Sequence, residues 1–217
     1  MVLLKAITPY QLALEKAGTM ADIIDKKNFE RLAQMDPQEV TDRTGSLYDL
    51  EKGIYTINAW GGTYEVDTAG CRITCPTESE GVFHDYFSLF LLYYLMQSTP
   101  QTSDGQWVSE KDLTGGAAFF RGPHTVPTSY IIKAFGLNLD KFKDRCRVLE
   151  GKAVSMGDAA FRFEITDKIP VTVIYWLGDE DFPSEANLLF DKTIEKHLPL
   201  DIVWALAVSV CRRLSSR

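Results

Sequence analysis

The segment that most restricts the fold is Val82–Gln97, in which apolar residues fall on nearly every side of a helix. Its most apolar part, Tyr86–Met96, is too short to cross a bilayer, which takes about 20 residues. A helix of this composition is typically buried all round. We therefore expect one fully apolar central helix, with a membrane-binding or partner-binding helix as the alternative.

The other patterns predict a single α+β domain over residues 1–217, with about six helices and about six strands in mixed or antiparallel sheets. Besides the central helix, the expected helices are Tyr10–Ala17, Met20–Met35 ending at Asp36-Pro37, Pro127–Phe135, Leu139–Leu149 and Pro199–Leu214. The expected strands are Ile54–Trp60, Thr63–Asp67, Cys71–Cys75, Ala153–Met156, Ala159–Ile165 and Val171–Leu177. Ser184–Ile194 is ambiguous, with a helix favoured.

The composition is that of a folded, acidic protein, with 45% hydrophobic residues and a net charge of -7. Nucleic acids and anionic membranes bind surfaces rich in Lys and Arg, so we expect neither as a partner. Met1–Leu4 is too short an apolar run for a secretory signal, and a cytoplasmic location is expected. A small-molecule or cofactor ligand and a protein partner remain open.

Common catalytic motifs are missing from the sequence. It contains no G-x-G-x-x-G, no phosphate-binding G-x-x-x-x-G-K-[ST], no G-x-S-x-G and no H-E-x-x-H. The three histidines His84, His124 and His197 are far apart in sequence, and no C-x-x-C occurs. These absences exclude the commonest classes of nucleotide-binding protein, hydrolase and zinc protease.

Two groups of residues resemble a known prokaryotic family. The first is Pro170–Pro183 with Leu189-Phe190-Asp191 and His197-Leu198-Pro199, and the second is Trp107-Val108-Ser109 with Leu113-Thr114-Gly115-Gly116. Both resemble the family catalogued as domain of unknown function 3786. Some of its members carry an iron–sulfur region, which the resemblance does not imply here because this chain lacks clustered cysteines. The resemblance implies a shared site but names no reaction or cofactor.

The Gly-Gly segment is the first candidate site. Ser109 and Asp112, which precede it, stand three apart and resemble a capping box for one helical turn. Gly115 and Gly116 would let the backbone approach a ligand, and free amides there could hold an anion. Phe120, Arg121 and His124 follow and could form an aromatic pocket with a cationic rim, to which we add Trp176. The alternative is that the glycines end a helix and the Phe119-Phe120 pair packs in the core.

The acidic turn Asp179-Glu180-Asp181, which follows the expected strand Val171–Leu177, is the second candidate site. With Asp191 it could bind a hard metal cation, which prefers oxygen ligands, or supply acid–base chemistry. The alternative is a solvated turn with Phe182-Pro183 as its hydrophobic anchor.

The leading functional hypothesis is a non-catalytic binding or accessory protein that holds a small anionic or cofactor-like ligand between these two sites. The first alternative is a metal-dependent hydrolase or transferase that uses the acidic turn, and the second is a protein-interaction module.

Overall fold

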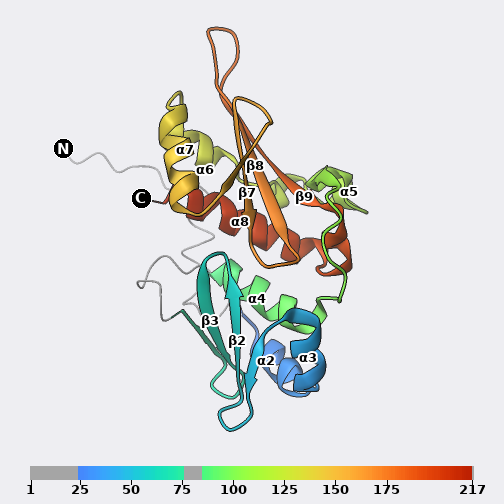
Figure 1. Ribbon diagram of the computed structural model, residues 1–217. Coiled ribbons are helices and arrows are strands. Elements are labelled where there is room, and N and C mark those ends of the chain that lie inside the picture. The colour runs from blue at the N-terminus through green and yellow to red at the C-terminus, as the bar shows by residue number, and fades with distance from the viewer. Residues whose placement is uncertain (1–23, 76–84, 217) are drawn as a thin grey trace, which may run out of the picture.

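The computed structural model describes residues 24–75 and 85–216 of the chain, and Figure 1 shows how their elements are arranged. The expected helix Tyr10–Ala17 lies outside the described residues. The α-helices are α2 Lys26–Ala33, α3 Pro37–Thr44, α4 Asp85–Gln97, α5 Gly116–Phe119, α6 Ser129–Phe135, α7 Leu139–Val148 and α8 Leu200–Ser215. Three short 3₁₀ turns are η2 Glu110–Asp112, η3 Gly122–His124 and η4 Lys192–Lys196.

The strands form two antiparallel sheets, which makes the fold α+β as predicted. One sheet has the order β1-β2-β3-β4 and the other β5-β9-β8-β7-β6. The first consists of β1 Leu47–Asp49, β2 Ile54–Ala59, β3 Gly62–Asp67 and β4 Arg72–Thr74. The second consists of β5 Trp107–Ser109, β6 Lys152–Val154, β7 Ala159–Glu164, β8 Pro170–Trp176 and β9 Glu185–Asp191.

Helix α4 lies between the two sheets and packs against α2, α3 and α8 (Figure 1). Most of its side chains are buried, as the sequence predicts. It is not apolar throughout, because Ser88 is buried within it and Gln97 is exposed at its end. The predicted first residues of this helix, from Val82, lie outside the described part of the chain.

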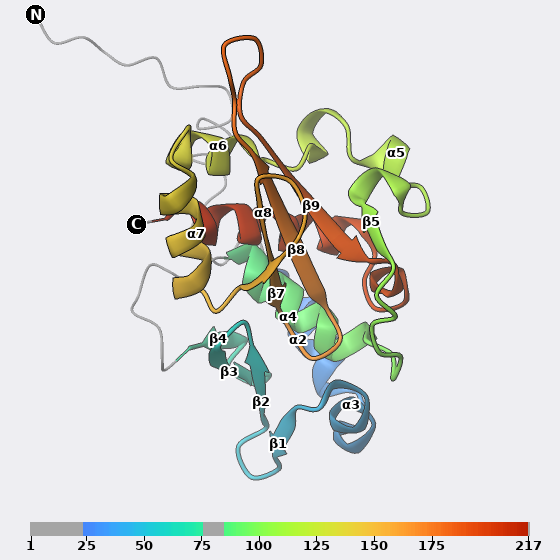
Figure 2. The same ribbon diagram turned by 45° about the horizontal axis from the view of Figure 1, so that its top comes forward.

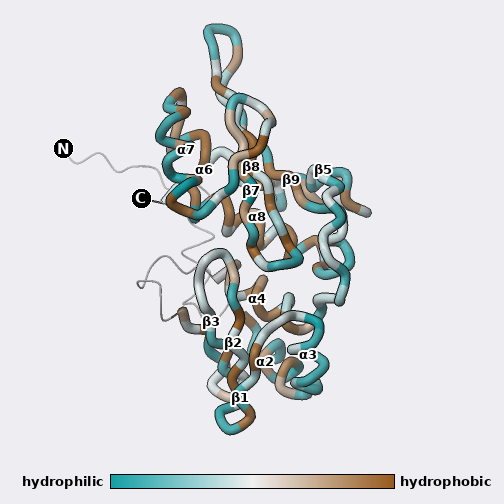
Figure 3. Tube along the Cα trace, viewed as in Figure 1, coloured by the Kyte–Doolittle hydropathy of each residue, from teal (hydrophilic) through white to brown (hydrophobic). Residues whose placement is uncertain are grey.

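Helices α6, α7 and α8 pack beside the five-stranded sheet (Figures 1 and 2). Phe142 of α7 stacks on Tyr175 of β8 at a ring-centroid distance of 4.9 Å and meets Phe161 of β7 edge-on at 6.0 Å. The final helix contributes Val203, Leu206 and other fully buried side chains. Tube colouring by hydropathy shows hydrophilic residues along α3 and α7 as well as in the outer loops (Figure 3).

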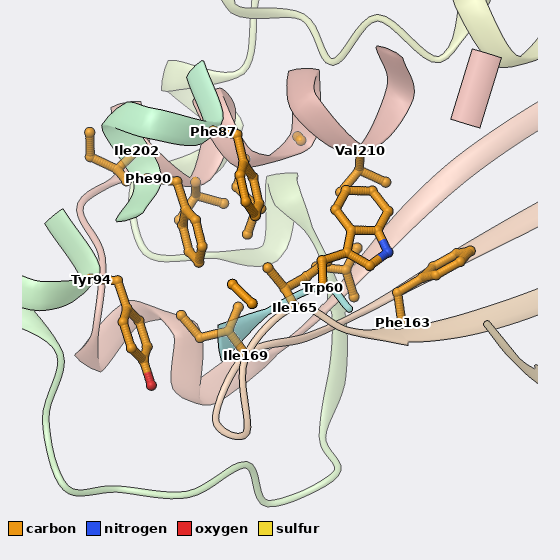
Figure 4. Close-up of a cluster of buried hydrophobic side chains, with 14 of the residues drawn as sticks. Trp60, Phe87, Phe90, Tyr94, Phe163, Ile165, Ile169, Ile202 and Val210 are labelled. Atoms are coloured by element: carbon orange, nitrogen blue, oxygen red, sulfur yellow. The ribbon is translucent and has the colours of Figure 1, made fainter. Parts of the chain in front are cut away.

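One cluster of buried side chains runs through both sheets. Figure 4 shows Trp60 from the β2–β3 turn beside Phe163 of β7, with Phe87 and Phe90 of α4 nearby. The Trp60 and Phe163 rings meet edge-on at 5.7 Å. The backbone N–H of Trp60 donates to the carbonyl oxygen of Ile165 at 2.8 Å, which joins the two sheets directly.

Four of the described elements, α3, β9, β1 and β5, differ from those predicted. Helix α3 was not predicted, because Asp36-Pro37 was expected only to end a helix. In the structure Asp36 accepts a hydrogen bond from the Gln38 N–H, and Pro37 occupies the first position of α3. The favoured helix at Ser184–Ile194 is wrong, because most of that segment is β9. The short strands β1 and β5 were also missed.

Candidate functional site

The Gly-Gly segment begins at the predicted capping residues. The hydroxyl and the backbone N–H of Ser109 donate to Asp112 Oδ2 at 2.7 and 3.3 Å. These hydrogen bonds lower the pKa of Asp112. They shape the tight turn η2, which follows β5 and leads the chain into α5.

The two glycines allow the backbone at the start of α5 to pack closely against the backbone of η2. Gly115 has φ 79°, which favours glycine, and leads into α5. A Cβ on Gly116 would collide with the carbonyl oxygen of Glu110. The Gly116 N–H donates to the Leu113 carbonyl at 2.7 Å. The close approach that these glycines allow is therefore to backbone. They begin α5, whereas the alternative expected them to end a helix.

His124 belongs to an aromatic stack. Its ring lies 4.4 Å from that of Phe119 with an interplanar angle of 17°, and it meets Trp204 of α8 edge-on at 5.6 Å. Phe119 in turn meets Phe120 edge-on at 5.1 Å. These ring contacts position the segment that follows α5 against α8.

A cavity of about 500 Å³ lies where η2, α5 and η3 face β9. Phe120 and Arg121 are the predicted site residues that line it. Gly115, Gly116, His124 and Trp176 are not among its lining residues. The lining is Glu110, Lys111, Ala117, Phe120, Arg121, Gly122, Thr125, Val126, Thr128, Asn187 and Leu188.

The cavity combines an apolar floor with a charged rim. Phe120 and Val126 are buried, whereas Lys111 and Arg121 are exposed. Neither cation forms an ion pair with any residue in 24–75 or 85–216. Glu110 is the single acidic residue of the lining. This arrangement suits a ligand with a negative group and an apolar body.

The acidic turn connects β8 to β9 at the tip of a projecting hairpin (Figure 2). Asp179 Oδ1 accepts from the backbone N–H groups of Asp181 and Phe182 at 2.9 and 2.8 Å, so this carboxylate shapes the turn. Asp179, Glu180 and Asp181 are exposed and do not line the cavity. Phe182 is 71% exposed and is therefore not the expected hydrophobic anchor.

Asp191 is separated from this turn by the length of β9, about 20 Å at the rise of a strand. It is 2% exposed and accepts from Gly105 N–H at 2.7 Å and from the Thr193 hydroxyl at 2.6 Å. Burial opposes its ionisation, but these hydrogen bonds outweigh that effect and lower its pKa. The structure does not bring the four predicted carboxylates together, and the described residues contain no group of three or more His, Cys, Asp or Glu side chains placed to hold a metal ion.

Trp176 lies half-buried at the end of β8, opposite Glu185 of β9. Sequence reasoning missed Lys111, Thr125, Thr128 and Asn187. Lys111 lies within the predicted capping box, but no pattern marked it as part of a site. Asn187 was hidden because its segment, Ser184–Ile194, was ambiguous in sequence and was not identified as a strand.

A second polar cluster lies buried between the sheets. The Lys168 ammonium donates to the carbonyls of Arg43 and Thr99, and His197 Nδ1 accepts from the Thr99 N–H at 3.2 Å. Burial, reinforced by Lys168, lowers the pKa of His197. Because these side chains bond largely to backbone groups, the cluster fastens the chain after α4 to α3, to the β7–β8 turn and to the segment before α8.

The comparisons with known proteins give a family. A family model described as Domain of unknown function (DUF3786) matches residues 36–213, and the chain belongs to that family. The match covers both the cavity and the acidic turn. Neither the curated proteins nor the solved structures contain a match to this chain. None of the described helices has the length and apolar character needed to span a bilayer.

Proposed function

We propose that this protein is a non-catalytic binding protein that holds a small anionic ligand in the cavity between Lys111 and Arg121. The observation that carries the proposal is the pair of rim cations without an ion-pair partner among the described residues. A volume of about 500 Å³ is within the range of small-molecule sites.

The lining supports a specific division of roles. Lys111 and Arg121 attract and orient the negative group, with the planar guanidinium suited to a carboxylate or phosphate. Thr125, Thr128 and Asn187 supply neutral hydrogen-bonding groups, and Phe120 contributes apolar surface. The ligand site differs from the sequence hypothesis because the acidic turn and His124 are outside it.

The charge of the whole chain supports a ligand other than a nucleic acid. The net charge of -7 disfavours a nucleic acid, whose binding depends on many cationic contacts.

The four cysteines are free thiols, which supports a cytoplasmic location.

Calorimetric titration with a panel of small carboxylates and phosphate esters tests the proposal. We expect binding that weakens with added salt and that falls at least about tenfold in Arg121→Ala and Lys111→Ala, since each variant removes one charge-assisted contact. Lys133→Ala, which removes an exposed cation of α6 outside the cavity, is the matched control. Equal affinity in all three variants, or no binding across the panel, would contradict the proposal.

A further inference from the structure

The edge of β9 beside the cavity is unpaired over half of its length. Strand β5 pairs with β9 only from Leu189 to Asp191. Glu185 to Leu188 pair with β8 on the other side, and no further backbone hydrogen bond joins them to the described residues. In an antiparallel strand, alternate residues direct both N–H and C=O to the same side. Two of these four residues therefore direct their backbone groups toward the open edge.

The cavity lies against that open edge. Asn187 and Leu188 are consecutive, so their side chains point to opposite faces of the sheet, as their exposed and buried states confirm. Both nevertheless line the same cavity. Because Glu110 and Lys111, which follow the end of β5, also line this cavity, we place it alongside the strand. It begins where β5 ends at Ser109 and the chain turns away through Glu110 and Lys111.

We propose that the ligand of this site is an extended acidic peptide that adds to the edge of β9 in the line of β5. This inference rests on the proposed anion site and names its ligand class. The free edge supplies backbone hydrogen bonds, as in other cases of strand addition. Lys111 and Arg121 select acidic side chains, and the apolar floor at Phe120 and Val126 accepts an apolar side chain of the same peptide.

The charge of the cavity rim and the length of the open part of β9 both support an acidic peptide as the ligand. The cavity rim carries two cations against one carboxylate, which complements an acidic chain. The four residues of β9 that have no partner on the β5 side span about 13 Å, enough for a short strand. An exposed strand edge is otherwise prone to unwanted pairing, which a specific partner would prevent.

The test uses a short fluorescein-labelled peptide that alternates glutamate with valine, titrated into the full chain by fluorescence polarisation. Two further peptides carry N-methyl groups on one or the other alternate set of backbone amides. We expect one of them to bind at least about tenfold more weakly, because its methylated set can no longer donate to β9. We also expect the Arg121→Ala variant to bind the parent peptide more weakly, whereas Lys133→Ala binds it as the wild type does.

Hydrogen exchange separates this inference from the anion proposal. The parent peptide should protect backbone amides within residues 185–188, and glutarate, a small dicarboxylate, should not. If glutarate binds at Arg121 while both methylated peptides bind like their parent and those amides stay unprotected, strand addition is refuted and the anion site stands. If neither glutarate nor the peptide binds, both proposals fail.

Discussion

The guanidinium of Arg43, from α3, donates to the carbonyl oxygen of Ser98 at 2.9 Å, just beyond the end of α4. It also donates to the Met96 carbonyl at 3.0 Å. The side chain is 8% exposed, so its charge is compensated by backbone dipoles at a helix C-terminus, where cations are favourable. Burial lowers the pKa of Arg43.

Replacing Arg43 should therefore destabilise the fold. In Arg43→Met the two carbonyls of Met96 and Ser98 lose a charged donor while remaining buried. We expect the free energy of unfolding to fall by about 2–4 kcal/mol in urea denaturation. The control is Arg72→Met, which removes an exposed ion pair with Asp67 and should cost no more than about 1 kcal/mol. Equal losses in the two variants would show that Arg43 does not hold the end of α4.

The buried histidine predicts a pH dependence. The pKa of His197 is lowered by burial and by Lys168, against the opposing effects of Asp191 and Asp167. Below about pH 6.5 the unfolded chain binds a proton that folded His197 does not, so stability falls as the pH falls toward the folded pKa.

Urea denaturation between about pH 7.5 and 5.5 measures this effect. In His197→Asn the side chain retains an acceptor near the Thr99 N–H but does not titrate. We expect its stability to depend less steeply on pH than that of the wild type. The same slope in both proteins would assign the pH dependence to other groups.

A single methyl group at Gly116 should disturb the cavity. The Cβ of Gly116→Ala would collide with the Glu110 carbonyl oxygen, which is backbone and cannot rotate away. We expect a loss of about 2–4 kcal/mol in the free energy of unfolding, with weaker ligand binding because Lys111 is displaced.

The matched control is Gly122→Ala. Gly122 has φ 57°, and a Cβ added to it would meet no atom within 4 Å, so this variant tests backbone conformation alone and should cost about 1 kcal/mol. A larger loss in Gly122→Ala than in Gly116→Ala would contradict the packing argument.

The thiols should differ in reactivity. Burial raises the pKa of Cys146 to about 12 and also raises that of Cys211, whereas Cys71 and Cys75 are half-buried. Since the thiolate is the reactive form, we expect an aromatic disulfide reagent to label at most Cys71 and Cys75 in the folded protein. Labelling in urea should reach all four cysteines. Rapid native labelling of Cys146, detected by peptide mass spectrometry, would contradict the burial seen for α7.

The elements predicted correctly from the sequence are those specified by residues close together in the chain. The central helix α4 follows from its composition, and α8 from an apolar run after Pro199. The β2–β3 hairpin follows from alternation around Gly61-Gly62, and the Ser109–Asp112 capping box was also predicted. In each case the residues that specify the structure are close together in the chain.

Strand β9 could not be predicted in this way. Its Leu188-Leu189-Phe190 run obscures the alternation of exposed Glu185 and Asn187 with buried side chains. It is a strand because β8 and β5 pair with it, and such tertiary context overrides local preference. The lining of the cavity was named in part for the same reason: Phe120 and Arg121 are local to the Gly-Gly segment, whereas Asn187 reaches the cavity only through sheet pairing.

The position of α4 between the two sheets makes the chain difficult to divide. A cut in the segment 98–106 would separate α4 from α8 and leave a broad apolar surface on each fragment. The two fragments would bury those surfaces best against each other. Any shortened relative that keeps only one sheet would need another element to replace the helix it has lost.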